Sequence, residues 1–202
     1  MPSKVVFLIF ALAVLIWESG CRGHDPVALS NRDPAVFRIN LDYMPRMLVF
    51  ALNTELWAAY DVEFSRLYKT WKGGINFNGP MYDDRHNVQS STRGTVYAVD
   101  TTRRSPWMIK IHDRKTPVKP EYLGYTLSAK STTIHYRIHQ PGKDDIHINE
   151  TPGYREEEDH SPVFTRTFEV TGMPSGSSLL LHVNEEKLQS VESMIIRGGS
   201  FL

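Results

Sequence analysis

Residues 133–138 read TIHYRI, and residues 145–149 read DIHIN. Apolar and polar residues alternate in both runs, which is typical of strands that bury one face and expose the other. In the first run the apolar residues share one face, while His135, Arg137 and His139 share the opposite face. The two runs therefore predict antiparallel β-strands with a polar outer face.

Apolar runs of strand length recur along the rest of the chain. Each is bounded by Gly, Pro, Asn, Asp or Ser, which are residues that end strands. No window of a dozen residues carries a convincing helical stripe, and the best of them is 184–195. The sequence therefore predicts an all-β fold, an antiparallel sandwich of two sheets. The runs are 36–41, 47–52, 56–61, 67–71, 95–99, 107–111, 122–127, 133–138, 145–149, 163–170 and 179–183.

The segment RLYKTWKGGINFNGPMY at 66–82 has two interpretations. In the first, Tyr68 and Thr70 alternate with their neighbours along a strand, and Gly73 and Gly74 permit the positive φ of a tight turn. In the second, its aromatic and basic residues form the rim of a ligand site. Aromatic residues are enriched in strands for packing reasons alone, so the first interpretation is favoured.

The composition excludes several classes of function. The chain has 202 residues, of which 41% are hydrophobic, and this suffices for one globular domain with a sizeable core. Lys plus Arg and Asp plus Glu both total 23, so no net charge attracts nucleic acid, and no nucleic-acid partner is expected. Cys21 is the only cysteine, which excludes an internal disulfide, a thiolate metal cluster and covalent c-type haem attachment. No cofactor is expected.

The N-terminal residues predict export. An apolar run at 5–16 has the length of a signal-peptide core and is short for a membrane span. Ser19 and Gly20 are small residues, and Cys21 follows them at once. This arrangement resembles the lipobox of bacterial lipoproteins, in which the cysteine is lipidated. An uncleaved or differently cleaved signal with an incidental cysteine is the alternative.

These segments divide the chain into three parts. We expect residues 1–20 to be a lipoprotein-type signal peptide and residues 21–34 to be a polar tether. Residues 35–202 are then a single β-sandwich domain. The expected location is a bacterial membrane, held by the lipid anchor alone and facing the periplasm or the cell exterior.

One stretch of the chain, residues 34–94, carries a set of short motifs. The motif residues are Arg46, Met47, Leu48, Leu56, Trp57, Ala59, Tyr60, Asp61, Trp71, Lys72, Gly73, Gly74, His86, Gln89 and Ser91. With these residues the stretch resembles the N-terminal β-rich region of large exported bacterial proteins that also carry c-type cytochrome and pyrroloquinoline-quinone sugar (sorbosone) dehydrogenase-like domains. The resemblance implies extracytoplasmic sugar or polyol oxidation, with a c-type cytochrome or sugar dehydrogenase as partner. This chain has neither the haem motif nor the dehydrogenase domain, so neither activity carries over.

The function predicted first is a non-catalytic accessory or carbohydrate-associated module of such a sugar-oxidising system. Sugar rings stack on aromatic planes while polar groups bind their hydroxyls, so Trp71, Asp61, Asn76 and His86 are the predicted ligand-binding residues. The chain ends soon after the last predicted strand. That fits a complete module as well as a chain cut off before catalytic domains.

Two alternatives remain open. His86 with Asp83 and Asp84 is the best catalytic candidate, because a histidine oriented by a carboxylate serves as general base on sugar hydroxyls, as in mutarotase-like enzymes. No motif that carries a mechanism supports it. The other alternative is a purely structural docking module whose aromatic residues form the core.

Three histidines are the most metal-like group. His135, His139 and His147 could hold zinc or copper if they came together. No cysteine or carboxylate stands at ligand spacing, and all three fall on polar strand faces. We therefore interpret them as surface histidines and expect no metal site.

Overall fold

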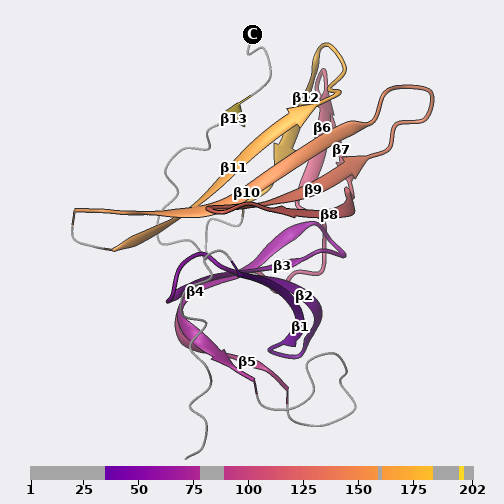
Figure 1. Cartoon of the computed structure of the whole chain (residues 1–202). Coiled ribbons are helices and arrows are strands. Elements are labelled where there is room, and N and C mark those ends of the chain that lie inside the picture. The colour runs from indigo at the N-terminus through magenta and orange to yellow at the C-terminus, as the bar shows by residue number, and fades with distance from the viewer. Residues whose placement is uncertain (1–34, 78–88, 159–160, 184–195, 198–202) are drawn as a thin grey trace, which may run out of the picture. The chain divides into compact units, whose positions relative to one another are not determined.

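The computed structural model of the chain describes residues 35–77, 89–158, 161–183 and 196–197, and every regular element among them is a β-strand. The strands form three sheets (Figure 1). Every strand pairing is antiparallel except that of β11 with β13. The all-β antiparallel fold predicted from the sequence is confirmed, and a third sheet of three short strands adds to the two predicted.

The first sheet is a meander of consecutive strands in the order β1-β2-β3-β4-β5. Its strands curve strongly (Figure 1), and buried core residues lie on both of its faces, although β5 has no buried residue. Phe50 and Tyr60 on one face pack against the second sheet, while Val49 and Trp71 on the other face pack inside the curve. The strands are β1 (Ala35–Leu41), β2 (Met44–Ala51), β3 (Leu56–Asp61), β4 (Arg66–Asn76) and β5 (Ser91–Val99).

The curved sheet closes where its first strand meets its last. Leu41 forms an isolated bridge with Ser90, and the amide of Asp42 donates to the Ser90 carbonyl at 3.0 Å. The Asp42 carboxylate accepts hydrogen bonds from Lys69 and Thr92. Burial raises the pKa of Asp42, but these hydrogen bonds outweigh it and hold that pKa below its ordinary value.

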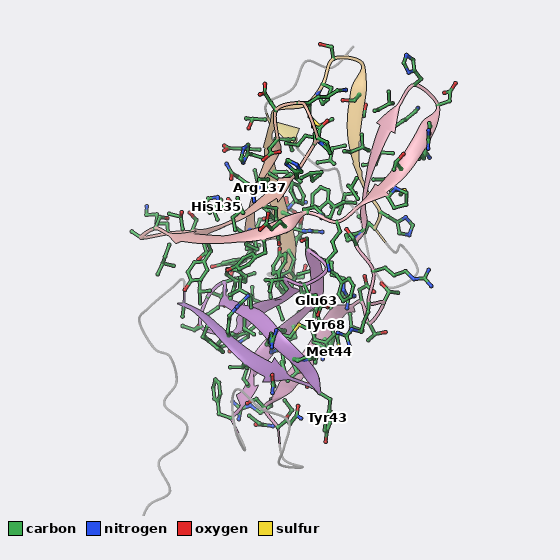
Figure 2. The ribbon with its side chains drawn as sticks, turned by 90° about the vertical axis from the view of Figure 1, so that its right-hand side faces the viewer. Tyr43, Met44, Glu63, Tyr68, His135 and Arg137 are labelled. Carbon is green, nitrogen blue, oxygen red and sulfur yellow. The ribbon has the colours of Figure 1, made fainter. Side chains whose placement is uncertain are left out.

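The contacts of Asp42 also hold a strained turn. Asp42 and Tyr43 have φ values of 51° and 64°, which non-glycine residues seldom adopt. They form the two-residue turn between β1 and β2, and Tyr43 is exposed at the end of this hairpin (Figure 2). The hydrogen bonds to Asp42 therefore stabilise both the turn and the closure of the sheet.

The two glycines at 73 and 74 do not form the predicted turn. Strand β4 continues through them to Asn76, and Gly73 pairs with Gly94 of β5. A Cβ on Gly73 would stand 2.3 Å from the carbonyl oxygen of Arg93, and φ at Gly73 is +133°. The glycines thus permit a close approach of two backbones within the sheet.

The second sheet has the order β13-β11-β10-β9-β8, and the third has the order β12-β6-β7. In β9 the side chains alternate between buried and partly exposed, as the sequence predicts. Strand β7 was not predicted, because its sequence RKTPV is polar and contains a proline. The strands are β6 (Trp107–Ile111), β7 (Arg114–Val118), β8 (Glu121–Leu127), β9 (Thr132–Ile138), β10 (Ile146–Glu156), β11 (Pro162–Thr171), β12 (Ser177–Leu181) and β13 (Ile196–Arg197).

Candidate functional site

A small pocket lies at the start of β4. It has a volume of about 70 Å³, and parts of the chain that are far apart in sequence line it. Arg66 and Leu67 come from β4, Val99 from the end of β5, and Arg166 from β11. His182, which follows β12, completes the wall. We call this the arginine pocket.

Arg66 is fixed on one side of the arginine pocket. Its side chain is only 1% exposed, and its guanidinium lies 3.0 Å from the Asp100 carboxylate and 3.4 Å from that of Asp61. It also donates to the Asp100 carbonyl at 2.5 Å. Its Nε has no hydrogen-bond partner in the described part of the chain. Arg66 is therefore held rigidly by its partners, with one N–H that has none among the described residues.

Asp100 is the acidic group of the pocket wall. Burial raises its pKa, but hydrogen bonds from Thr102 and the charge of Arg66 outweigh this and hold the pKa below its ordinary value. Asp100 is therefore ionised at neutral pH and engaged as an acceptor. A carboxylate in this state is a weak general base.

Arg166 connects the pocket with a buried cluster of charges. Its Nε donates to Glu150 Oε1 at 2.6 Å, and the Tyr60 hydroxyl donates to the same oxygen at 2.6 Å. Glu150 is 0% exposed. The guanidinium of Arg166 also lies over the Phe168 ring, 5.0 Å from its centroid. These contacts hold Arg166 in one orientation between the two larger sheets.

The buried cluster shifts the ionisation of its members. Burial and the charge of Glu150 raise the pKa values of Tyr60 and Tyr136 well above their ordinary value. Burial lowers the pKa of Arg166, but the charge of Glu150 outweighs it and raises that pKa. Both tyrosines are therefore neutral and Arg166 is charged across the physiological pH range.

Some polar atoms of the buried cluster have no hydrogen-bond partner among the described residues. Within the described ranges, Arg166 Nη2, Glu150 Oε2 and the Tyr136 hydroxyl have no hydrogen-bond partner. Buried polar groups are nearly always paired, because an unmade hydrogen bond costs about 1–3 kcal/mol. Arg166 and Arg66 both line the pocket, and each has one buried N–H without a partner in the described part of the chain.

The pocket suits binding better than proton transfer. Each arginine already has a carboxylate partner, so its charge is balanced without a ligand. The remaining N–H donors require an acceptor oxygen, and Leu67 and Val99 add apolar surface. This combination fits a small neutral ligand that carries hydroxyl groups.

The sequence-based site residues do not meet at this pocket. Trp71 is 0% exposed, donates from Nε1 to the Gly74 carbonyl at 2.9 Å and stacks on Trp57. The structure leaves no face of the Trp71 ring open, and the prediction that Trp71 binds a sugar ring stays a prediction. Trp57 and Trp107 are also buried, so the tryptophans of the described strands build the core.

The other predicted residues are scattered. Asp61 is buried and ion-paired with Arg66, but it does not itself line the arginine pocket. Asn76 lies at the far end of β4, with its amide 3.5 Å from the Ser91 hydroxyl. His86, Asp83, Asp84 and the lipidation residue Cys21 lie outside the described residues.

The histidines of the second sheet lie on its polar outer face, as predicted. His135 forms hydrogen bonds with Thr126 at 2.7 Å and with Asn149 at 2.8 Å. His135 and Arg137 are neighbours on the same face of β9 (Figure 2). Over the described ranges, no three His, Cys, Asp or Glu side chains come together as metal ligands.

Sequence reasoning missed the residues that build the pocket. A signal for one of them was present, because Ile146, Ile148 and Glu150 share one face of β10 by their spacing of two. A charged residue on an apolar face needs a partner, and Arg166 lies on the neighbouring strand β11. The position of Arg66 depends on how β4, β5 and β11 meet, which spacing along the chain does not encode.

The chain was compared with protein-family models, curated proteins and solved structures. No protein-family model, curated protein or solved structure matches this chain. In the described part of the chain, no helix is long and apolar enough to span a bilayer.

Proposed function

We propose that the chain is a non-catalytic accessory module of an extracytoplasmic sugar-oxidising system and that it binds a small neutral sugar or polyol in the arginine pocket. The observation that carries the ligand assignment is the pair of fixed arginines that line the pocket, Arg66 and Arg166. Each is paired with a carboxylate, and each has one buried N–H that finds no partner among the described residues. A hydroxyl oxygen accepts such a hydrogen bond without bringing a further charge into the pocket.

The cellular setting in this proposal comes from the resemblance of residues 34–94. Most of the residues that carry the resemblance and are described by the structure are buried in the first sheet, among them Met47, Trp57 and Trp71. The similarity is therefore mainly one of framework. The proposed ligand is a sugar or polyol because that is the substrate class of the family's setting and because the pocket offers donors for hydroxyl groups.

The proposed role is binding because the charged groups of the described pocket wall are already engaged by partners. Arg66 and Arg166 are ion-paired with carboxylates, and Asp100 is held ionised by its hydrogen bonds and by the charge of Arg66. The enzyme alternative built on His86 stays a prediction, since that residue lies outside the described ranges.

A docking module without a ligand is the second candidate. It is favoured by the burial of Trp57, Trp71 and Trp107, which leaves none of these aromatic rings open for stacking on a sugar. The two candidates differ in one measurable respect: only the first requires the arginine pocket to be accessible to a sugar.

Calorimetric titration separates these candidates. Glucose, sorbose and sorbitol are each titrated into the parent protein and into Arg166→Lys, which keeps the charge beside Glu150 but loses the planar donor array. We expect one of these ligands to bind the parent and to bind Arg166→Lys at least about tenfold more weakly, since losing one hydrogen bond costs roughly 1–2 kcal/mol.

The matched control is Arg137→Lys, an arginine of the outer face that is ion-paired with Glu121. Its affinity for the sugar should equal that of the parent. Equal affinity in Arg166→Lys and the parent would place the ligand elsewhere, and absence of binding by all three compounds would favour the docking module.

A further inference from the structure

Positive charge is concentrated in residues 103–119, which include two strands of the third sheet, β6 and β7. The whole chain has a net charge of zero, but in this stretch Asp113 is the only acidic residue against six basic ones. Within the described ranges, only one of the six forms an ion pair, Arg103 with Glu63. The basic residues are Arg103, Arg104, Lys110, Arg114, Lys115 and Lys119.

The third sheet places two of these lysines opposite each other. Lys110 of β6 pairs with Lys115 of β7, and directly opposite residues of antiparallel strands lie on the same face. On the other side of β6, Lys110 pairs with Ser178 of β12, so this row contains no carboxylate. Like charges opposite each other destabilise a sheet. An external anion would relieve the repulsion between the two lysines.

The lysine row lies on the outer face of the third sheet. Ile109, which alternates with Lys110 along β6, packs against the main core and so defines the inner face. The neighbouring row of the outer face is apolar, with Leu180 and Pro117 paired on either side of Met108. Leu180 and Met108 are partly exposed, and Pro117 is exposed. We call these two rows together the basic face.

The basic face is complementary to the surface of an anionic bilayer. Phosphate groups cover such a surface and apolar chains lie beneath it, so lysine ammonium groups contact phosphates while neighbouring apolar side chains enter the headgroup layer. Each basic side chain near an anionic lipid surface strengthens binding by about fivefold. A single small anion would instead require donors that converge on one point.

We propose that the basic face docks onto a bilayer that contains anionic phospholipids, with Lys110 and Lys115 as the phosphate-binding residues. The docking adds a second membrane contact to the lipid anchor expected at Cys21. It would hold the third sheet against the bilayer rather than leave the domain free at the end of its tether. The inference depends neither on sugar binding nor on lipidation of Cys21.

Vesicle flotation tests the role of the two lysines. The full chain with Cys21→Ser is mixed with vesicles of phosphatidylglycerol and phosphatidylcholine in equal parts, and with vesicles of phosphatidylcholine alone. Lys110→Gln with Lys115→Gln should raise the lipid concentration for half-maximal binding to the anionic vesicles at least about tenfold. All variants keep residues 5–16, so the phosphatidylcholine vesicles measure what that apolar run contributes.

The matched control removes the same charge elsewhere. Lys130 and Lys143 are exposed and lie in the turns on either side of β9. Lys130→Gln with Lys143→Gln should bind the anionic vesicles as the parent does. Equal weakening by the two double variants would show an effect of net charge alone and would overturn the proposal, as would equal binding of the parent to both kinds of vesicle.

A fluorescent label tests which face meets the lipid. In the chain with Cys21→Ser, a nitrobenzoxadiazole label is attached to Ser178→Cys on the basic face or to Thr167→Cys, an exposed position of β11. Anionic vesicles should shift the emission of the Ser178→Cys label to shorter wavelength and leave that of the Thr167→Cys label unchanged. Equal shifts of both labels would overturn the proposal. Binding of soluble polyphosphate without a shift on vesicles would also overturn it and assign the face to a soluble polyanion.

Discussion

The first and second sheets bury their side chains in different ways. In β3 of the first sheet every residue is buried, whereas in β9 of the second sheet buried and partly exposed residues alternate. The difference follows from the partners of each sheet, since the first is covered on both faces and the second on one. A continuous apolar run such as LWAAYD therefore marks a strand between two cores, while alternation marks a strand with one open face.

The same contrast applies to charged pairs. Arg166 and Glu150 lie between the sheets, with the carboxylate fully buried, whereas Arg137 and Glu121 lie on the open face of the second sheet. Burial changes what such a pair contributes. A buried charge that loses its partner is costly, and an exposed one is solvated by water.

The largest expected effect is on a residue inside the first sheet. Trp71→Ala should lower the free energy of unfolding by about 3–5 kcal/mol, because it removes a fully buried ring and its stacking contact with Trp57. His135→Ala on the outer face should lower it by less than about 1 kcal/mol. Urea unfolding followed by circular dichroism measures both. Similar costs for the two variants would contradict the assignment of inner and outer faces.

The buried charge pair comes next. Arg166→Ala leaves Glu150 without its partner and should cost about 3–5 kcal/mol, close to the largest effect. Arg137→Ala should cost about 0–1 kcal/mol. The double variant Arg166→Met with Glu150→Leu should recover most of the loss, and failure to recover it would show that the pair contributes more than mutual neutralisation.

The glycines offer a comparison within the backbone. Gly73→Ala should lower the free energy of unfolding by about 1–3 kcal/mol, because φ is positive and the new Cβ would meet the Arg93 carbonyl oxygen. Gly124 also has a positive φ, but a Cβ there would meet no atom within 4 Å. Gly124→Ala should therefore cost less. Thermal unfolding of the two variants ranks them, and the reverse order would refute the close approach of β4 and β5.

The smallest expected effect is a pH dependence at the closure of the first sheet. The folded-state pKa of Asp42 lies below its ordinary value of 3.8, so its stabilising contribution is complete above that pH and is lost as the pH falls through the folded-state pKa. Lys69→Met removes one hydrogen bond to Asp42. The free energy of unfolding of the Lys69→Met variant should therefore fall less steeply than that of the parent as the pH drops below about 4. Parallel curves for the two proteins would contradict this origin.

The sequence predicted the strands well because a strand's period and its bounding residues are local properties. Each predicted run overlaps a strand, although 47–52, 145–149 and 179–183 extend one or two residues past a strand end. The polar face of His135 and His147 is where alternation places it. The third sheet was harder to predict from the sequence, because the sequence of β7 is too polar to resemble a strand. Whether a run of glycines ends a strand or lies within it depends on the neighbouring strand. The predicted turn at Gly73 was wrong for this reason, because Gly73 pairs with Gly94 of β5.

The candidate site was much less predictable. Arg66 begins β4 and Trp71 lies at its middle, and the sequence drew attention to the middle because tryptophan and glycine are conspicuous there. The arginine pocket depends on the meeting of β4, β5 and β11. Only the inward position of Glu150 on β10 could have pointed to a buried partner such as Arg166.

The proposed binding of a sugar at the arginine pocket can be tested directly with two tryptophans near β4. Trp107 donates from its indole N–H to the carbonyl of Ser65, the residue before Arg66, at 2.7 Å, whereas the indole N–H of Trp71 donates to the carbonyl of Gly74, away from the pocket along β4. A two-dimensional NMR titration with glucose, sorbose and sorbitol observes both indole N–H signals at once. The account predicts that the sugar shifts the Trp107 signal and leaves that of Trp71 unchanged. A shift of Trp71 without one of Trp107 would contradict it.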